Sequence, residues 1–186
     1  MSKKKNVKGK RLVHTHAYLH HAAYWALERA EAKREGSFHF SMFAILGAIH
    51  AIEAYMNHLG QSRFSNWNSR GLRSPKDKFK ALRKNFRLET KSYESDYQRY
   101  LIGLVMRDKL VHGRTEYLKG EWSSELSENH MLDILSTNWE KLCNPKDARK
   151  IFEACERLIR TLARGAGERE DAYHDFGYSY TESETI

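Results

Sequence analysis

Residues 97–113, YQRYLIGLVMRDKLVHG, decide how this chain is expected to fold. Projected as a helix at about 100° per residue, the stretch places most of its apolar side chains on one arc. That arc is formed by Tyr97, Leu101, Leu104, Val105 and Val111. Asp108 falls in its middle with His112 beside it. The stretch therefore predicts a core helix that carries ionisable groups in its last two turns.

Both ends of this helix carry sequence signals. Ser95 and Gln98 have the three-residue spacing of a capping box. In this motif each side chain accepts a hydrogen bond from the other residue's free backbone amide at the start of a helix. Gly113 marks the end. Two signals around one apolar run indicate a helix of about five turns.

Three ionisable side chains converge near the end of this helix. Asp108 and His112 are four residues apart, so the carboxylate can hold one ring nitrogen and orient the other. Arg107 lies roughly 140° from His112 on an ideal helix. These two meet only if the last turn unwinds or a second copy supplies the partner. The plainer interpretation is a solvated helix end, where His112 complements the negative end of the helix dipole.

Two motifs give the chain a resemblance to a known family. RDKLVH at residues 107–112 resembles the Arg, polar residue, three variable residues, His signature of the HEPN superfamily, named for higher eukaryotes and prokaryotes nucleotide-binding. AIEAYMN at residues 51–57 is similar to the Glu-Ala-x-x-Asn of an earlier helix in that superfamily. The resemblance covers roughly residues 12–165 in outline and is sharp at these two places.

The resemblance implies an all-α, HEPN-like antiparallel bundle of five to six helices that pairs as a two-fold symmetric homodimer. It implies a metal-independent endoribonuclease with no cofactor, such as a toxin or an antiviral defence effector. Arg107, His112, Asp108 and Glu53 would be its catalytic residues. An antitoxin or a nucleotidyltransferase is a further partner to consider. A non-catalytic module for dimerisation or for binding nucleotides or RNA stays open, because some relatives lack the activity.

Composition bounds the partners and the compartment. A formal net charge of +8 favours an acidic partner such as RNA, with anionic membrane as the lesser alternative. Cys143 and Cys155 are isolated, which argues against a disulfide framework or a zinc ribbon and fits the cytoplasm. Without a run of 18 apolar residues, and without an apolar stretch after the basic start, neither a membrane span nor a signal peptide is expected.

The chain divides into three parts. Residues 1–11 carry six Lys or Arg and are expected to be a flexible basic arm, either a solubilising tail or an RNA contact. Residues 12–165 form the helical domain. Residues 166–186, rich in acidic and aromatic side chains, are expected to be disordered or peripheral.

Helical periodicity predicts five more helices, and only two prolines argue against a β architecture. Their expected ranges are 12–35, 37–59 ended by Gly60, 75–86, 131–142, and 146–164 ended by Gly165. The helix at 37–59 is apolar around nearly its whole circumference and should be central. Its one polar stripe contains His50, Glu53 and Asn57, and Arg107 is the candidate partner for the carboxylate. A structural ion pair is the plainer role.

An RNA-binding surface is predicted where positive charge gathers. The loop after Gly60 and the helix that follows it combine Arg, Lys and aromatic side chains, although such a run is usually a solvated face. The residues expected to bind substrate are Arg70, Arg73, Lys80, Arg83, Lys84, Arg114 and Asn57. Arg114 also opens a polar loop that could gate the site.

Four histidines, at positions 14, 16, 20 and 21, crowd the first helix. His16 and His20 have the spacing of a two-histidine metal face, yet no third ligand is evident. Exposed or structural histidines are therefore expected, and no metal site.

A dimer would solve the chemistry of cleavage. RNA cleavage without a metal needs a base, an acid and a cation, and one histidine does not easily serve as both base and acid. Two apposed copies of the 97–113 helix would supply two His112 and two Arg107 side chains. Ile102, Met106 and Leu110 make the back of this helix apolar as well, which predicts a dimer interface there. By analogy with the family, the product would be a 2′,3′-cyclic phosphate.

Overall fold

The computed structural model describes residues 6–32, 35–69, 71–72, 74–121 and 134–184. Its helices and strands, in chain order, are β1 (Asn6–Arg11), α1 (Thr15–Glu31), α2 (Ser37–Arg63), α3 (Pro75–Asn85), α4 (Glu94–Val111), α6 (Asn138–Leu142), α7 (Pro145–Ala166) and β2 (Ser179–Glu184). Three 3-10 turns add η1 (Trp67–Ser69), η2 (Thr90–Ser92) and η3 (Ala172–His174). The predicted all-α bundle is confirmed, with six α-helices in the described ranges packed together.

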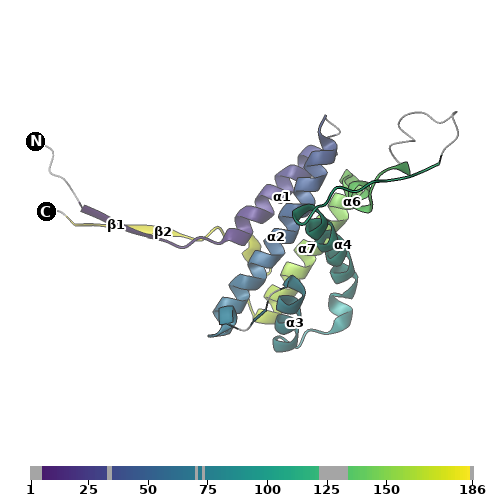
Figure 1. Ribbon diagram of the computed structural model, residues 1–186. Coiled ribbons are helices and arrows are strands. Elements are labelled where there is room, and N and C mark those ends of the chain that lie inside the picture. Colours follow the sequence, from purple (N-terminus) through teal and green to yellow (C-terminus); the bar gives the residue numbers. More distant parts are fainter. Residues whose placement is uncertain (1–5, 33–34, 70, 73, 122–133, 185–186) are drawn as a thin grey trace, which may run out of the picture.

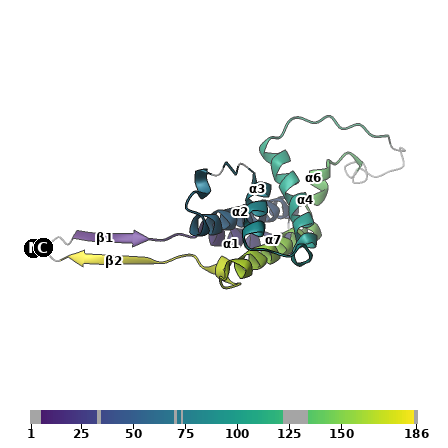
Figure 2. The same ribbon diagram turned by 90° about the horizontal axis from the view of Figure 1, so that it is seen from below.

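Helix α2 is the centre of the bundle. It packs against α1, α3, α4 and α7, and these neighbours surround it in Figures 1 and 2. Its side chains at Ile45, Ile49, Ile52 and Met56 are fully buried. At Gly47 a Cβ atom would lie 2.8 Å from the Cβ of Ala23, so α1 and α2 touch backbone to backbone. The central position predicted for this helix is confirmed.

The same helix is long and apolar enough, by length and composition alone, to cross a membrane. It is the one helix of this kind among the residues that the structure describes. A core helix passes the same test, and the packing of α2 against four other helices accounts for its apolar composition.

Two glycines that the sequence marked as helix ends lie inside helices. Helix α2 continues past Gly60 to Arg63, and a Cβ atom at Gly60 would lie 2.1 Å from the indole of Trp67. Helix α7 continues past Gly165, where a Cβ atom would lie 2.6 Å from Leu88. Its stop is Gly167, which has a left-handed φ of 70°. The predicted ends at 60 and 165 were wrong because these glycines make room for neighbours.

The start of α4 also differs from its prediction. The helix begins at Glu94 after Tyr93, and no side chain caps it. The amide of Gln98 donates to Glu94 Oε1 at 2.6 Å, so the predicted capping box with Ser95 does not form. A capping box occurs at α6 instead, where Thr137 and Glu140 bond to each other's backbone amides.

The capping box at Thr137 and Glu140 interrupts the helix predicted over 131–142. Residues 131–133 lie outside the described ranges, and Ser136 and Thr137 are not helical. Helix α6 therefore starts afresh at Asn138 and spans five residues.

Strands β1 and β2 form an antiparallel ribbon that extends away from the bundle (Figures 1 and 2). Lys8 lies opposite Glu182 in the register, and Asn6 lies opposite Glu184. The sequence predicted a flexible arm over residues 1–11, and for residues 6–11 the structure replaces it with a strand. The pairing joins opposite ends of the chain, so no local sequence pattern predicts it.

Candidate functional site

The two sequence motifs meet in the bundle. Arg107, in the last turns of α4, points its Nη2 toward Glu53 Oε2 of α2 at 3.8 Å. Lys78 of α3 donates from Nζ to the other carboxylate oxygen of Glu53 at 2.8 Å. Arg107 and Lys78 are only 16% and 15% exposed. The predicted contact between Glu53 and Arg107 is confirmed, and Lys78 adds a second cation to the same carboxylate.

Asp108 belongs to this cluster rather than to His112. Its Oδ1 lies 3.3 Å from Arg107 Nε, at an angle that leaves the buried Nε without a hydrogen bond. The bond between residues 108 and 112 is the backbone one, from the His112 amide to the Asp108 carbonyl at 3.0 Å. The expectation that the Asp108 carboxylate holds the His112 ring is therefore not met in this chain, because the carboxylate pairs with the Arg107 guanidinium instead.

His112 is the exposed residue that closes α4. It lines an open surface hollow of about 710 Å³ together with Asp108, Lys109, Arg114 and Glu116. Arg107 is not among the residues that line this hollow. A single chain therefore separates Arg107 from His112, as the 140° between them on an ideal helix predicts.

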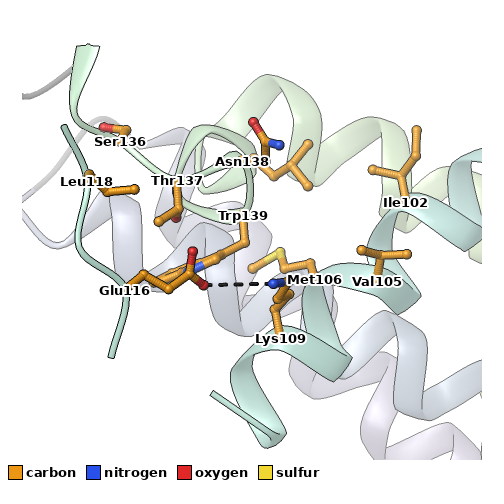
Figure 3. A pocket seen from close by; sticks show the side chains of 11 residues that line it. Ile102, Val105, Met106, Lys109, Glu116, Leu118, Ser136, Thr137, Asn138 and Trp139 are labelled. Carbon is orange, nitrogen blue, oxygen red and sulfur yellow. Dashed lines mark ion pairs between the residues drawn. The ribbon is translucent and has the colours of Figure 1, made fainter. Parts of the chain in front are cut away.

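A second hollow, of about 580 Å³, lies beside the first (Figure 3). Ile102, Val105 and Met106 of α4 face Leu118 and the start of α6 across it. At its edge Lys109 Nζ lies 3.9 Å from Glu116 Oε1, the ion pair dashed in Figure 3. The loop that starts at Gly113 thus borders both hollows, which is the position a gate would need.

The exposed side of α4 carries apolar side chains among polar ones, but these are not all the ones that the helical projection predicted. Val105 and Val111 were placed on the inward arc, yet they are 56% and 59% exposed. Met106 was placed on the outer side and is fully buried. Ile102 is exposed as predicted, at 48%. The difference arises because α7 and α2 both pack on α4 at Gly103, so the buried face of α4 is centred near Gly103 and not on the arc that the projection predicted.

The residues predicted to bind RNA are only partly brought together. Lys80 and Lys84 are exposed on α3, whereas Arg83 donates to the hydroxyl of Tyr93 at 2.9 Å. Arg114 lies at the His112 hollow. Arg70 and Arg73 lie outside the described residues.

Asn57 is separated from this group. Its Oδ1 accepts from Trp67 Nε1 at 3.4 Å, and it lines a different hollow, of about 290 Å³, with His14 and His58. The structure therefore gives Asn57 a hydrogen bond within the bundle instead of a place at the His112 hollow.

Two residues at the Glu53 cluster, Lys78 and Tyr100, were not singled out from the sequence. Lys78 was indistinguishable from the other lysines of its helix. Tyr100 is fully buried, and its hydroxyl finds no hydrogen-bond partner among the described residues. Burial raises the pKa of Tyr100, and nearby Cys155 and Glu53 raise it further. Only its place on the inner face of the quoted stretch could have pointed to it.

Over the described ranges, no group of three or more His, Cys, Asp or Glu side chains is arranged to hold a metal ion. In comparisons with known proteins, no family model matches the chain, and no curated protein or solved structure matches it either.

Proposed function

We propose that this chain is a metal-independent endoribonuclease of the HEPN type that acts as a two-fold dimer. The observation that carries the proposal is the contact between the two motifs, Arg107 of RDKLVH with Glu53 of AIEAYMN. An arginine held by a carboxylate near a helix end is fixed in orientation, which is what a group that stabilises developing charge requires.

The arginine of the cluster suits a phosphate. Glu53 holds Arg107 beside Lys78 in a largely buried setting, and the other carboxylate on Arg107, that of Asp108, is 54% exposed. A guanidinium binds phosphate oxygens in pairs, with charge-assisted hydrogen bonds. In this proposal Arg107 stabilises the extra negative charge that the phosphate gains in the transition state.

His112 would move the protons. A histidine ordinarily titrates near neutral pH and can act as either base or acid. One His112 takes the proton from the ribose 2′-hydroxyl, whose oxygen then bonds to phosphorus. The bond from phosphorus to the 5′-oxygen breaks, and the His112 of the second copy gives that oxygen a proton. The product is a 2′,3′-cyclic phosphate.

The exposed side of α4 supports the dimer on which this scheme depends. Ile102 and Val105, three residues apart on one face, form an exposed apolar stripe on the helix that carries His112. Exposed apolar groups that gather in this way usually mark an interface. A two-fold axis beside the stripe would bring together two α4 helices and, with them, the His112 and Arg107 side chains that one chain keeps apart.

The test is RNA cleavage by purified protein in EDTA. Wild-type protein is expected to cleave, while His112→Ala and Arg107→Ala each lose at least about 10²-fold, as typical of a lost acid, base or charge-stabilising group. His39→Ala, at an exposed position of α2, is the control and should cleave normally. Cleavage that continues undiminished in folded His112→Ala protein would refute the proposal.

A second candidate is a non-catalytic module for dimerisation or RNA binding. The observation that favours it is the pairing of Arg107 with Glu53 and Asp108, which keeps Arg107 out of the His112 hollow. This candidate predicts RNA binding or self-association without any cleavage in the same assay.

A further inference from the structure

The segment between α7 and β2 is held to the bundle by backbone hydrogen bonds, by Tyr173 and by several histidines. This segment, residues 167–178, crosses the N-terminal part of α1 and the C-terminal part of α2. Its backbone accepts hydrogen bonds from Leu12, at the Tyr178 carbonyl (2.8 Å), and from His14, at the Phe176 carbonyl (3.4 Å). At Gly177 a Cβ atom would lie 2.2 Å from the Leu12 carbonyl oxygen, so these two segments of the chain are in close contact.

One group of histidines lies between the start of α1 and the C-terminal part of α2. The rings of His14, His16 and His58 are mutually 4.9–5.4 Å apart between centroids. His14 Nδ1 lies 3.6 Å from Asp175 Oδ2, and His58 Nε2 lies 4.0 Å from Glu168 Oε2. His14 and His58 therefore each face a carboxylate of the crossing segment.

Tyrosine, arginine and acidic side chains surround this first set. Tyr55 of α2 donates to Glu168 at 3.1 Å, and its ring lies 4.9 Å from that of His16. Arg169, paired with Asp171, and His174 line the same hollow of about 400 Å³ as His14 and His58. Three imidazoles thus share a small space with carboxylates that belong to the segment they hold.

A second group surrounds His20, one turn farther along α1. Its ring lies 4.6 Å from that of Tyr173 and 5.3 Å from that of His174, both in η3. Tyr173 is buried, donates to Glu156 Oε1 at 2.8 Å, and accepts from Arg160 at 2.7 Å. It anchors the segment to α7 as well as to α1.

His20 itself is arranged to be neutral. It is 6% exposed, and its Nε2 has no hydrogen-bond partner among the described residues, with Glu156 Oε2 4.0 Å away. Burial lowers the pKa of His20 to about 4, against a smaller opposing effect of Glu156, and His174, His21 and Arg160 lower it further. Burial also lowers the pKa of His58, with Glu168 and Asp175 opposing and His14 assisting.

We propose that His20 and His58 form an acid-sensitive clasp, which holds residues 167–178 to α1 and α2 near neutral pH and releases them in mild acid. The ribbon continues directly from this segment, and a two-stranded ribbon is at best marginally stable by itself, so release lets β2 separate from β1. Strand β1 carries Lys8, Lys10 and Arg11, and β2 carries Glu182 and Glu184. Release thus frees a basic strand from an acidic one.

The direction follows from the lowered pKa values. A histidine whose pKa is lower in the folded state stabilises that state when neutral, so its contribution is complete above about pH 6.5 and is lost as the pH falls toward 4. With an ordinary value of 6.5 and a folded value of about 4, protonation of His20 alone raises the opening equilibrium about 30-fold at pH 5.

Hydrogen–deuterium exchange of the full chain at pH 7.5 and pH 5.0 tests the clasp. Rates are divided by the intrinsic exchange rate at each pH. Peptides from residues 6–14 and 167–184 are expected to lose protection at pH 5.0 by about 30-fold, while α2 and α7 keep theirs. Unchanged protection in the two terminal peptides, or a loss that spreads equally over α2 and α7, overturns the proposal.

Variants separate the clasp from general acid effects. His20→Phe with His58→Gln removes two titrating rings and should abolish the acid-induced loss, whereas His39→Gln, exposed on α2 outside the clasp, should behave as wild type. His58→Gln alone, with a side chain that is one-third exposed, serves if His20→Phe fails to fold, and should weaken the acid response. A response equal to wild type in the clasp variants overturns the proposal.

Discussion

Glu53 shows how one carboxylate ties three helices together. It lies on α2 and contacts Lys78 of α3 and Arg107 of α4. Removing it would take the carboxylate from Lys78 and leave Arg107 with Asp108 alone, and an uncompensated buried charge is destabilising.

Glu53→Ala should therefore lower the free energy of unfolding by about 1–2 kcal/mol, below the value for fully buried pairs because Glu53 is partly exposed. Urea denaturation measures the change. Glu153→Ala, which breaks an exposed pair with Arg157 on α7, is the matched control and should cost at most about 0.5 kcal/mol. Equal effects in the two variants would show that the Glu53 cluster adds no stability.

At the scale of elements, close helix contacts depend on glycines that carry no side chain into a neighbour. Gly60 lies beneath the Trp67 indole of η1, and Gly103 lets α4 approach Ile49 of α2 and Ile151 of α7. A methyl group at either position would need atoms to move, and overpacking of this kind usually costs about 1–3 kcal/mol.

Gly60→Ala is expected to lower the melting temperature even though alanine favours helices more than glycine does. The reason is the 2.1 Å approach of its Cβ atom to Trp67. In a Trp67→Ala background the same substitution should be neutral or stabilising. Additive effects of the two changes, measured in a double-mutant cycle, would contradict this explanation.

How much could be predicted at this scale depended on the range of the interaction. The apolar circumference of α2 and the motif at Glu53 were enough to predict a central helix and its contact with Arg107. Gly60 and Gly165 misled because a packing glycine and a terminating glycine are the same residue in a sequence. Lys78 could not be singled out, because its partner lies in another helix and its neighbours are also lysines. The pairing of β1 with β2 joins distant segments and leaves no periodic signal.

For the whole molecule, the exposed stripe on α4 decides whether the proposed dimer forms. Ile102 and Val105 contribute little to the single bundle, since about half of each side chain is exposed. Aspartate at these positions should therefore leave the fold intact and prevent association, because two apposed copies would bury like charges.

Sedimentation velocity at micromolar concentration should show a dimer for the wild type and a monomer for Ile102→Asp/Val105→Asp, with unchanged circular dichroism. Phe43→Asp, at an equally exposed apolar position on α2, is the control and should remain dimeric. RNA cleavage should be lost together with the dimer. A wild type that sediments only as a monomer would remove the basis for shared catalytic residues.

The ribbon has a mechanical consequence. In its register Asn6 lies opposite Glu184, so tension applied between these two positions pulls on the first pair of an antiparallel ladder. Under that load the hydrogen bonds open one after another, like a zip, instead of sharing the force. Six residue pairs would part before any tension reached the helices. The ribbon would thus act as a weak link that gives way first and leaves the bundle unstretched.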